Sequence, residues 1–224
     1  MDNGLSVTMN TFLPYVYVIM SGIVNTLILS ITGFILATVL GLIFSFIEIY
    51  GPNIISLIID WMLRIIRGIP LVLMLFIIFY GLPQLGIRFS PIVSAILGIG
   101  IIDSAYQAQL FRGIIITVSE RQLEAAYSIG LSTWNAFRYI VIPQAFRIAL
   151  PAWINEFSIV LKDSSMAYAI GVTEIFTQAI HVANATMDYL TPLVFVSIIY
   201  FLICYPLSQL SNHLHKKLSL MGFI

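Results

Sequence analysis

The stretch that decides the fold reads Glu124-Ala125-Ala126-Tyr127-Ser128-Ile129-Gly130, and it lies in the longest polar interval of an otherwise apolar chain. Glu120 and Glu124 make this interval compatible with water. Ala125, Ala126 and Gly130 are small, and small side chains let a partner approach the backbone closely. Glycine can also bend or end a helix. The pattern predicts a surface helix that a separate protein contacts; the alternative is an ordinary amphipathic connection between two membrane spans.

The composition points to a membrane environment. Of the 224 residues, 60% are hydrophobic and only 9% are charged, and the mean hydropathy is +1.02. Soluble domains carry about 25% charged residues, so this chain could not keep a globular surface hydrated. We therefore predict an all-α integral membrane protein with about five transmembrane helices. The formal net charge of zero gives no sign of nucleic-acid binding.

Residues for metal binding or catalysis are sparse. Cys204 is the single cysteine, which excludes an intrachain disulfide, and His181, His213 and His215 are scattered or terminal. No glycine-rich phosphate loop ending in Gly-Lys-Ser/Thr occurs, so the chain is not itself an ATPase. We predict a chain that is not an enzyme and carries no cofactor or metal of its own.

The apolar segments predict one transmembrane domain over residues 1–224. Residues 1–10 lack the positive n-region of a cleaved signal peptide, so we expect the first apolar segment to be retained as a span. Gly68-Ile69-Pro70 permits a kink in the second span, and Pro151 interrupts the fourth. A helix at 119–140 connects the third and fourth spans. The predicted spans cover roughly residues 15–46, 54–82, 91–118, 143–166 and 189–211.

The distribution of basic residues predicts the orientation. With five spans and the polar interval inside, the N-terminus is outside and the C-terminus is cytoplasmic. The outer loops then keep only Arg88, which is a strong positive-inside bias. We expect Arg64 and Arg67 to snorkel to the inner headgroups. The predicted cytoplasmic basic residues are Arg64, Arg67, Arg112, Arg121, Arg138, Arg147, Lys216 and Lys217.

Four charged residues fall within predicted spans: Asp103, Glu156, Lys162 and Asp163. Each costs about 2.5–3.5 kcal/mol at mid-bilayer, so such a residue needs a partner or a wet cavity. Glu156 and Asp163 are two helical turns apart, about 10 Å along one face. Asp103 and Gln107 likewise share a face. Three acids against one lysine predict a pocket for an ammonium group.

The remaining polar residues suggest how such a pocket would complete its ligand. A carboxylate could be met by Ser104, by Gln107, or by backbone amides freed at Gly68 or Pro151. Tyr106 offers a hydroxyl or a cation–π face. In the alternative interpretation, Lys162 pairs with an acid and only locks two helices together. The predicted substrate-binding residues are Asp103, Ser104, Tyr106, Gln107, Glu156 and Asp163.

The spacing EAA-x3-G-x9-I-x-I-P, from Glu124 to Pro143, resembles the EAA signature of ABC-transporter permease subunits, with Ile142 in place of leucine. Further segments resemble polar-amino-acid permeases: RGIPL at 67–71, YGLP at 80–83, PQAFRIALP at 143–151 and LKDSS at 161–165. Departures occur at Asp103, where the family often has asparagine, and at Gln109, where it usually has glutamate. The resemblance covers nearly the whole chain.

This resemblance implies a fold like that of type I ABC importers and a set of partners. Separate ATPase subunits, which bind ATP and Mg, would dock on the 119–140 coupling helix through Glu120, Glu124, Ala125, Ala126 and Gly130. A second permease chain, identical or paralogous, would complete the pathway in a bacterial inner membrane. An extracellular or periplasmic binding protein would deliver the amino acid. The acidic pocket favours a cationic amino acid (arginine, lysine, histidine) or cystine.

Two other functions also fit the sequence. An ion-coupled secondary amino-acid transporter would use the embedded acids as proton or sodium relays. A non-transporting scaffold would use the 119–140 helix only to recruit a partner.

Overall fold

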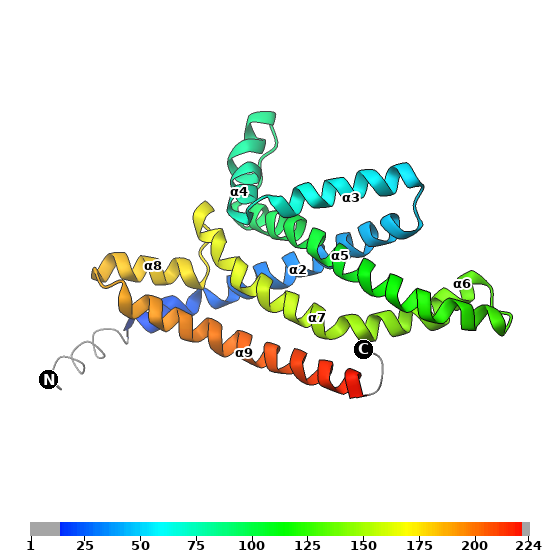
Figure 1. Ribbon diagram of the computed structural model, residues 1–224. Helices are drawn as coiled ribbons and strands as arrows, with labels where there is room; N and C mark the ends of the chain where they lie inside the picture. The colour runs from blue at the N-terminus through cyan, green and yellow to red at the C-terminus, as the bar shows by residue number, and fades with distance from the viewer. Residues whose placement is uncertain (1–13, 221–224) are drawn as a thin grey trace.

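The computed structural model describes residues 14–220, apart from the side chains of Glu120 and Arg121, and it consists of helices joined by short turns and loops, with no strand among those residues (Figure 1). The predicted all-α class is confirmed. The predicted outward N-terminus lies in residues 1–13, outside the described part. The helices are α2 (Ile23–Tyr50), α3 (Asn53–Gly68), α4 (Leu71–Phe76), α5 (Pro91–Ser128), α6 (Thr133–Ala136), α7 (Ile142–Asp163), α8 (Ile175–Thr186) and α9 (Leu190–Leu220).

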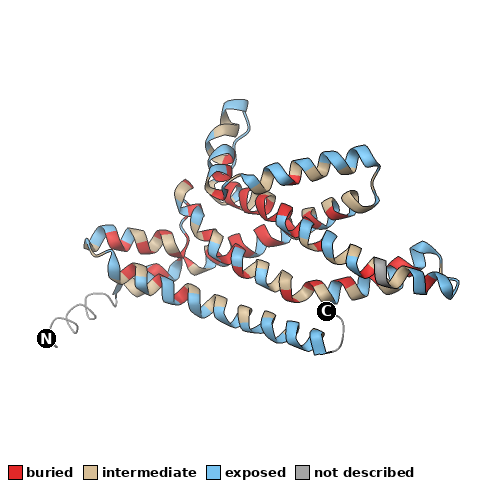
Figure 2. Ribbon diagram, viewed as in Figure 1, coloured by how far each residue is buried: buried red, intermediate tan, exposed pale blue. Residues whose placement is uncertain are grey.

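Four long helices, α2, α5, α7 and α9, extend along the molecule, with α6 at one end and α8 at the other (Figure 1). The most extensive contact joins α2 and α5. Glycines make it possible: a Cβ added at Gly33 would lie 2.9 Å from Ile99 Cγ2, and one at Gly41 would lie 2.9 Å from Gln107 Cβ. Small residues at helix interfaces let backbones approach closely in membranes. Buried residues accordingly concentrate where these helices meet, and much of α9 is exposed (Figure 2).

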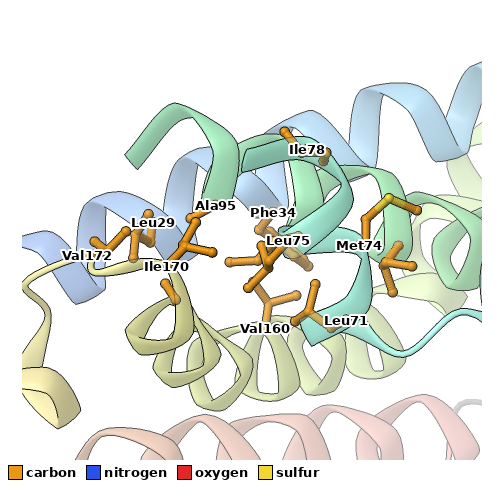
Figure 3. Packing of buried hydrophobic residues seen from close by; sticks show 13 residues of the cluster. Leu29, Phe34, Leu71, Met74, Leu75, Ile78, Ala95, Val160, Ile170 and Val172 are labelled. Atoms are coloured by element: carbon orange, nitrogen blue, oxygen red, sulfur yellow. The ribbon is translucent and has the colours of Figure 1, made fainter. Parts of the chain in front are cut away.

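The largest apolar cluster holds α4 against α2, α5 and α7. Leu75 of α4 is fully buried between Phe34 of α2 and Val160 of α7 (Figure 3). Leu71, at the start of α4, lies close to Val160 (Figure 3). This packing fixes the position at which α4 leaves α3, and that position shapes the site described below.

A sharp bend separates α3 from α4. The two segments of the pair, Asn53–Gly68 and Leu71–Leu85, meet at 100°. The N–H of Ile69 makes a final bond to Ile66 O, and Pro70 has no N–H with which to continue the helix. The predicted kink is confirmed, but its size means that residues 54–82 do not form one straight span.

Two π-helical stretches, Ile77–Gly81 and Phe137–Val141, each end two residues before a proline. Pro83 and Pro143 cannot donate to the preceding turn, and their rings crowd the carbonyl four residues back. A wider π turn relieves that crowding. By contrast, Pro151 lies inside α7 without ending it, so the predicted interruption of the fourth span is wrong.

By length and composition, three helical segments among the described residues can cross a membrane. They are Pro14–Tyr50, which includes α2, Pro91–Ser128 (α5) and Leu190–Leu220 (α9). The bent pair of α3 and α4 would make a fourth. The predicted fourth span corresponds to α7, whose charged residues reduce its hydropathy. The count of five spans therefore stays a prediction.

The polar interval at 119–140 is not a single helix. α5 continues through the interval to Ser128, and α6 begins only at Thr133. Between them Gly130 has φ of +79°, its N–H bonds to Tyr127 O, and the N–H of Leu131 bonds to Ala126 O. This pair of bonds is the Schellman motif, in which a left-handed glycine ends a helix. The predicted role of Gly130 in bending or ending a helix is confirmed.

Candidate functional site

A cavity of about 690 Å³ lies where the bend between α3 and α4 faces α5 and α7. Its charged lining residues are Arg67 at the end of α3, Asp103 on α5, and Glu156 and Asp163 on α7. Tyr106 of α5 adds a half-exposed phenol. The apolar lining comes from Ile69, Leu71, Ile99, Ile102, Ile159, Val160 and Met166.

Four of the six predicted substrate-binding residues line this cavity: Asp103, Tyr106, Glu156 and Asp163. Glu156 and Asp163 face it together, as their seven-residue spacing on one helix predicts. Lys162 is exposed, does not line the cavity, and makes no ion pair with any described residue. The cavity therefore holds three carboxyl groups without the lysine expected from the sequence. Whether these residues bind substrate stays a prediction.

Ser104 and Gln107 do not line the cavity, which corrects their predicted position. Ser104 is fully buried, and its hydroxyl donates to Ile101 O at 2.7 Å. Gln107 is also fully buried, behind Asp103, and its Nε2 donates to Asp103 Oδ2 at 2.6 Å. Both residues lie on the side of α5 that packs closely on Gly41 of α2. Gln107 is thus a positioning residue for Asp103.

The side-chain oxygen of Gln107 accepts hydrogen bonds that link α5 to α2 and α7. Thr38 Oγ1 of α2 donates to Gln107 Oε1 at 2.8 Å. Trp153 Nε1 of α7 donates to the same oxygen at 3.2 Å and to Thr38 Oγ1 at 3.1 Å. The carboxylate of Asp103 is thereby linked through one amide to both α2 and α7.

We expect Gln107→Leu to destabilise the protein by about 1–3 kcal/mol, the usual cost of leaving a buried polar group without a partner. Asp103 is only 7% exposed, and Gln107 supplies its side chain with its one hydrogen bond among the described residues. Thermal unfolding in detergent measures the effect. Gln109→Leu is the matched control, because Gln109 is exposed on the same helix. Equal stability of the two variants would contradict the positioning role.

Arg67 lies in the cavity, which differs from its predicted position. We expected it to reach the inner headgroups, yet it lines the cavity and its Nη1 donates to Ala105 O at 3.2 Å. The hydroxyl of Tyr106 in turn donates to Arg67 O at 3.4 Å. The sequence feature that could have indicated this position is Gly68-Ile69-Pro70, directly after Arg67. The helix α3 ends there, and its last turn faces α5.

The chemistry of the cavity suits a polar guest. Three carboxyl groups and a guanidinium in a chain this apolar require water or a ligand in the cavity. No group of three or more histidine, cysteine or acidic residues placed to hold a metal ion occurs in the described part of the chain. The arrangement can bind a cationic group among the acids and surround an aliphatic portion with isoleucine and methionine side chains.

The turn between α5 and α6 forms a second candidate site. Glu124, Ala125 and Gly130 are exposed there, while Ala126 is buried. The side chain of Glu120 lies outside the described part. Two large apolar side chains, Ile129 and Trp134, are 74% and 64% exposed. Exposed apolar residues within a polar interval are typical of a protein contact surface. Coupling to an ATPase through these residues stays a prediction.

Comparison with known proteins identifies the family. The chain matches the model of the binding-protein-dependent transport system inner membrane component over residues 37–220. The chain belongs to this family. The resemblance to ABC-transporter permeases that the sequence indicated is therefore confirmed, and so is the assignment as a multi-pass membrane transport protein.

Relatives of this inner membrane component carry transport names. The probable amino-acid ABC transporter permease protein YckA of Bacillus subtilis (strain 168) is 35% identical over 91% of this chain and 89% of its own length. The L-cystine transport system permease protein TcyB of the same organism is 30% identical over 97% of both chains. The glutamine transport system permease protein GlnP of Escherichia coli (strain K12) is 29% identical, covering 93% of this chain and 96% of its own.

Solved structures of permeases share the fold. An amino acid ABC transporter crystallised with histidines gives a TM-score of 0.86 at 30% identity, over 92% of this chain and 97% of that one. The inward-facing MetNI methionine ABC transporter gives 0.70 at 17% identity, over 90% and 98%. The second likeness concerns the fold alone. Together they support the predicted ABC-importer type of fold.

Proposed function

We propose that this chain is the membrane-spanning subunit of an ATP-driven amino-acid importer, and that its cavity receives a cationic amino acid (arginine, lysine or histidine) or cystine. The observation that carries the substrate class is the convergence of Asp103, Glu156 and Asp163 on one cavity with a single guanidinium. An excess of carboxyl groups favours guests with more than one ammonium or an added cation, and disfavours glutamate and aspartate. Relatives named for cystine and arginine transport support this choice.

The same proposal includes the partners and the source of energy. Separate ATPase subunits, with their ATP and Mg, dock at the turn between α5 and α6. A second permease chain, identical or paralogous, faces the cavity, and an external binding protein delivers the amino acid. The turn is then cytoplasmic, with the N-terminus outside and the C-terminus inside a bacterial inner membrane. Family membership favours this arrangement over an ion-coupled transporter.

The cavity acids provide the test. In vesicles containing the permease, its ATPase and its binding protein, Glu156→Gln and Asp103→Asn are each expected to weaken uptake of cationic substrate by about 10- to 100-fold. That range corresponds to one charged hydrogen bond of about 1.5–3 kcal/mol. Asp60→Asn is the control, because Asp60 pairs with Arg64 outside the cavity.

Two results would contradict the proposal. Unchanged apparent affinity of both variants for every cationic amino acid and cystine would rule out the pocket. Uptake that needs no ATP and collapses with an uncoupler would replace the ATP-driven importer with the ion-coupled alternative.

A further inference from the structure

Arg67 has unused hydrogen-bonding capacity inside the cavity. A guanidinium has five N–H donors, and the structure gives this one a single acceptor, the main-chain Ala105 O. It forms no ion pair with a described residue, although three carboxyl groups line the same cavity. Arg67 thus lines the same cavity as the three acids without an ion pair to any of them.

We infer that Arg67 binds the α-carboxylate of the transported amino acid, while the carboxyl groups of α5 and α7 bind its cationic groups. This inference rests on the proposed function and adds the residue that selects amino acids over simple amines. A guanidinium matches a carboxylate with two parallel hydrogen bonds, a geometry that lysine cannot reproduce. The two opposite charges of the bound amino acid would then be met by residues on different helices.

The other side chains that could meet the carboxylate are buried or already bonded. Ser104 and Gln107 are fully buried and do not line the cavity, and they donate to Ile101 O and to Asp103 instead. Tyr106 donates to the carbonyl of Arg67 itself, which helps to hold the end of α3 against α5. Arg67 is therefore the cavity side chain with both the charge and the spare donors for an anionic group.

The experiment compares an amino acid with its α-amide, which keeps the side chain and the ammonium but has no carboxylate. Competition for a radiolabelled amino acid is measured on the purified permease–ATPase complex in nanodiscs, without binding protein. Arginine, lysine, histidine and cystine are each tested with their amides. The wild type should prefer the acid by about 10- to 100-fold. In Arg67→Gln the acid should weaken to the level of the amide, while affinity for the amide changes by less than about 2-fold.

Arg64→Gln is the matched control, an arginine on the same helix that pairs with Asp60 outside the cavity. It should keep the wild-type preference. If Arg67→Gln does not assemble, Arg67→Lys retains the charge and a donor for Ala105 O. Because lysine cannot form two parallel hydrogen bonds to a carboxylate, Arg67→Lys should reduce the preference for the acid over the amide by about 3- to 10-fold.

The outcomes separate this inference from the function on which it rests. A wild type without preference for the acid, or an Arg67 variant that keeps the preference or loses acid and amide equally, overturns the role of Arg67. A wild-type complex that binds none of the four amino acids overturns the proposed function instead.

Discussion

Gly41→Leu is expected to destabilise the protein by at least about 1–3 kcal/mol, the cost of overpacking a tight interface. A Cβ at Gly41 would lie 2.9 Å from Gln107 Cβ, 3.1 Å from Ala108 N and 3.1 Å from Ser104 O. Two of these neighbours are backbone atoms, so a leucine side chain can be accommodated only if α2 moves away from α5. A lower midpoint of thermal unfolding in detergent is the expected measurement.

The same substitution should also impair binding in the cavity. Separation of α2 from α5 breaks the 2.8 Å bond from Thr38 Oγ1 to Gln107, and Gln107 positions Asp103. Gly113→Ala is the control on α5, because a Cβ there has no neighbour within 4 Å. Since alanine favours a helix over glycine by roughly 0.5–1 kcal/mol, that variant should be as stable as the wild type or slightly more so. A Gly41→Leu variant that unfolds with the wild type would refute the close packing of α2 on α5.

Helical periodicity located part of the site from the sequence. Glu156 and Asp163 lie on one regular helix, so their spacing alone placed them on one face, and both line the cavity. The same rule was insufficient on α5. Asp103 and Gln107 do share a face, yet Asp103 lines the cavity while α2 covers Gln107. Periodicity gives the relative direction of side chains, but which neighbour covers each sector depends on packing between distant segments.

The position of Arg67 could not be obtained from the sequence for a related reason. The residues Gly68-Ile69-Pro70 predict that a helix ends, but they do not give the direction of the next helix. The 100° bend is fixed by burial of Leu75 and its neighbours against α2 and α7. A positive-inside assignment therefore placed Arg67 at the headgroups, whereas the bend places it beside α5.

The boundary of the connecting interval was predicted from polarity rather than from helix-ending signals. Charged residues begin near Ser119, which marks where the chain leaves the apolar environment. No residue between Ser119 and Ser128 stops a helix, so α5 continues until Gly130. A change in polarity and the end of a helix are set by different interactions, and here they lie about ten residues apart, or about 15 Å.

The two candidate sites are joined by the helices that build them. α5 carries Asp103 and Tyr106 and ends at the turn; α7, which follows that turn through α6, carries Glu156 and Asp163. From Tyr106 to Ser128, α5 extends about 33 Å without a break. A force applied at the turn by a docked ATPase would therefore reach both acidic walls of the cavity along rigid helices. If an ATPase docks at the turn, as proposed, we expect the conformation of Gly130 to affect coupling.

Substitution of Gly130 is expected to uncouple ATP hydrolysis from uptake, in an order set by the backbone. Its φ of +79° is in the left-handed region, and a Cβ there would meet no atom within 4 Å. The effect is therefore conformational strain rather than a clash, about 1–2 kcal/mol for an ordinary residue and less for asparagine. Uptake driven by the reconstituted ATPase should decrease in the order Gly, Asn, Ala, Val, with the valine variant lower by about tenfold.

Gly113→Val distinguishes this mechanism from a general effect of glycine replacement. Gly113 also has open space around its Cβ position, but it lies within the right-handed helix α5, where valine is tolerated. That variant should transport normally. If the strained turn is the cause, Gly130→Val should still insert, bind its ATPase and hydrolyse ATP at the basal rate, while added substrate and binding protein no longer stimulate hydrolysis. Normal stimulation in Gly130→Val would show that the α5–α6 turn does not transmit work to the cavity, because the strain would then have no consequence for the helices that line it.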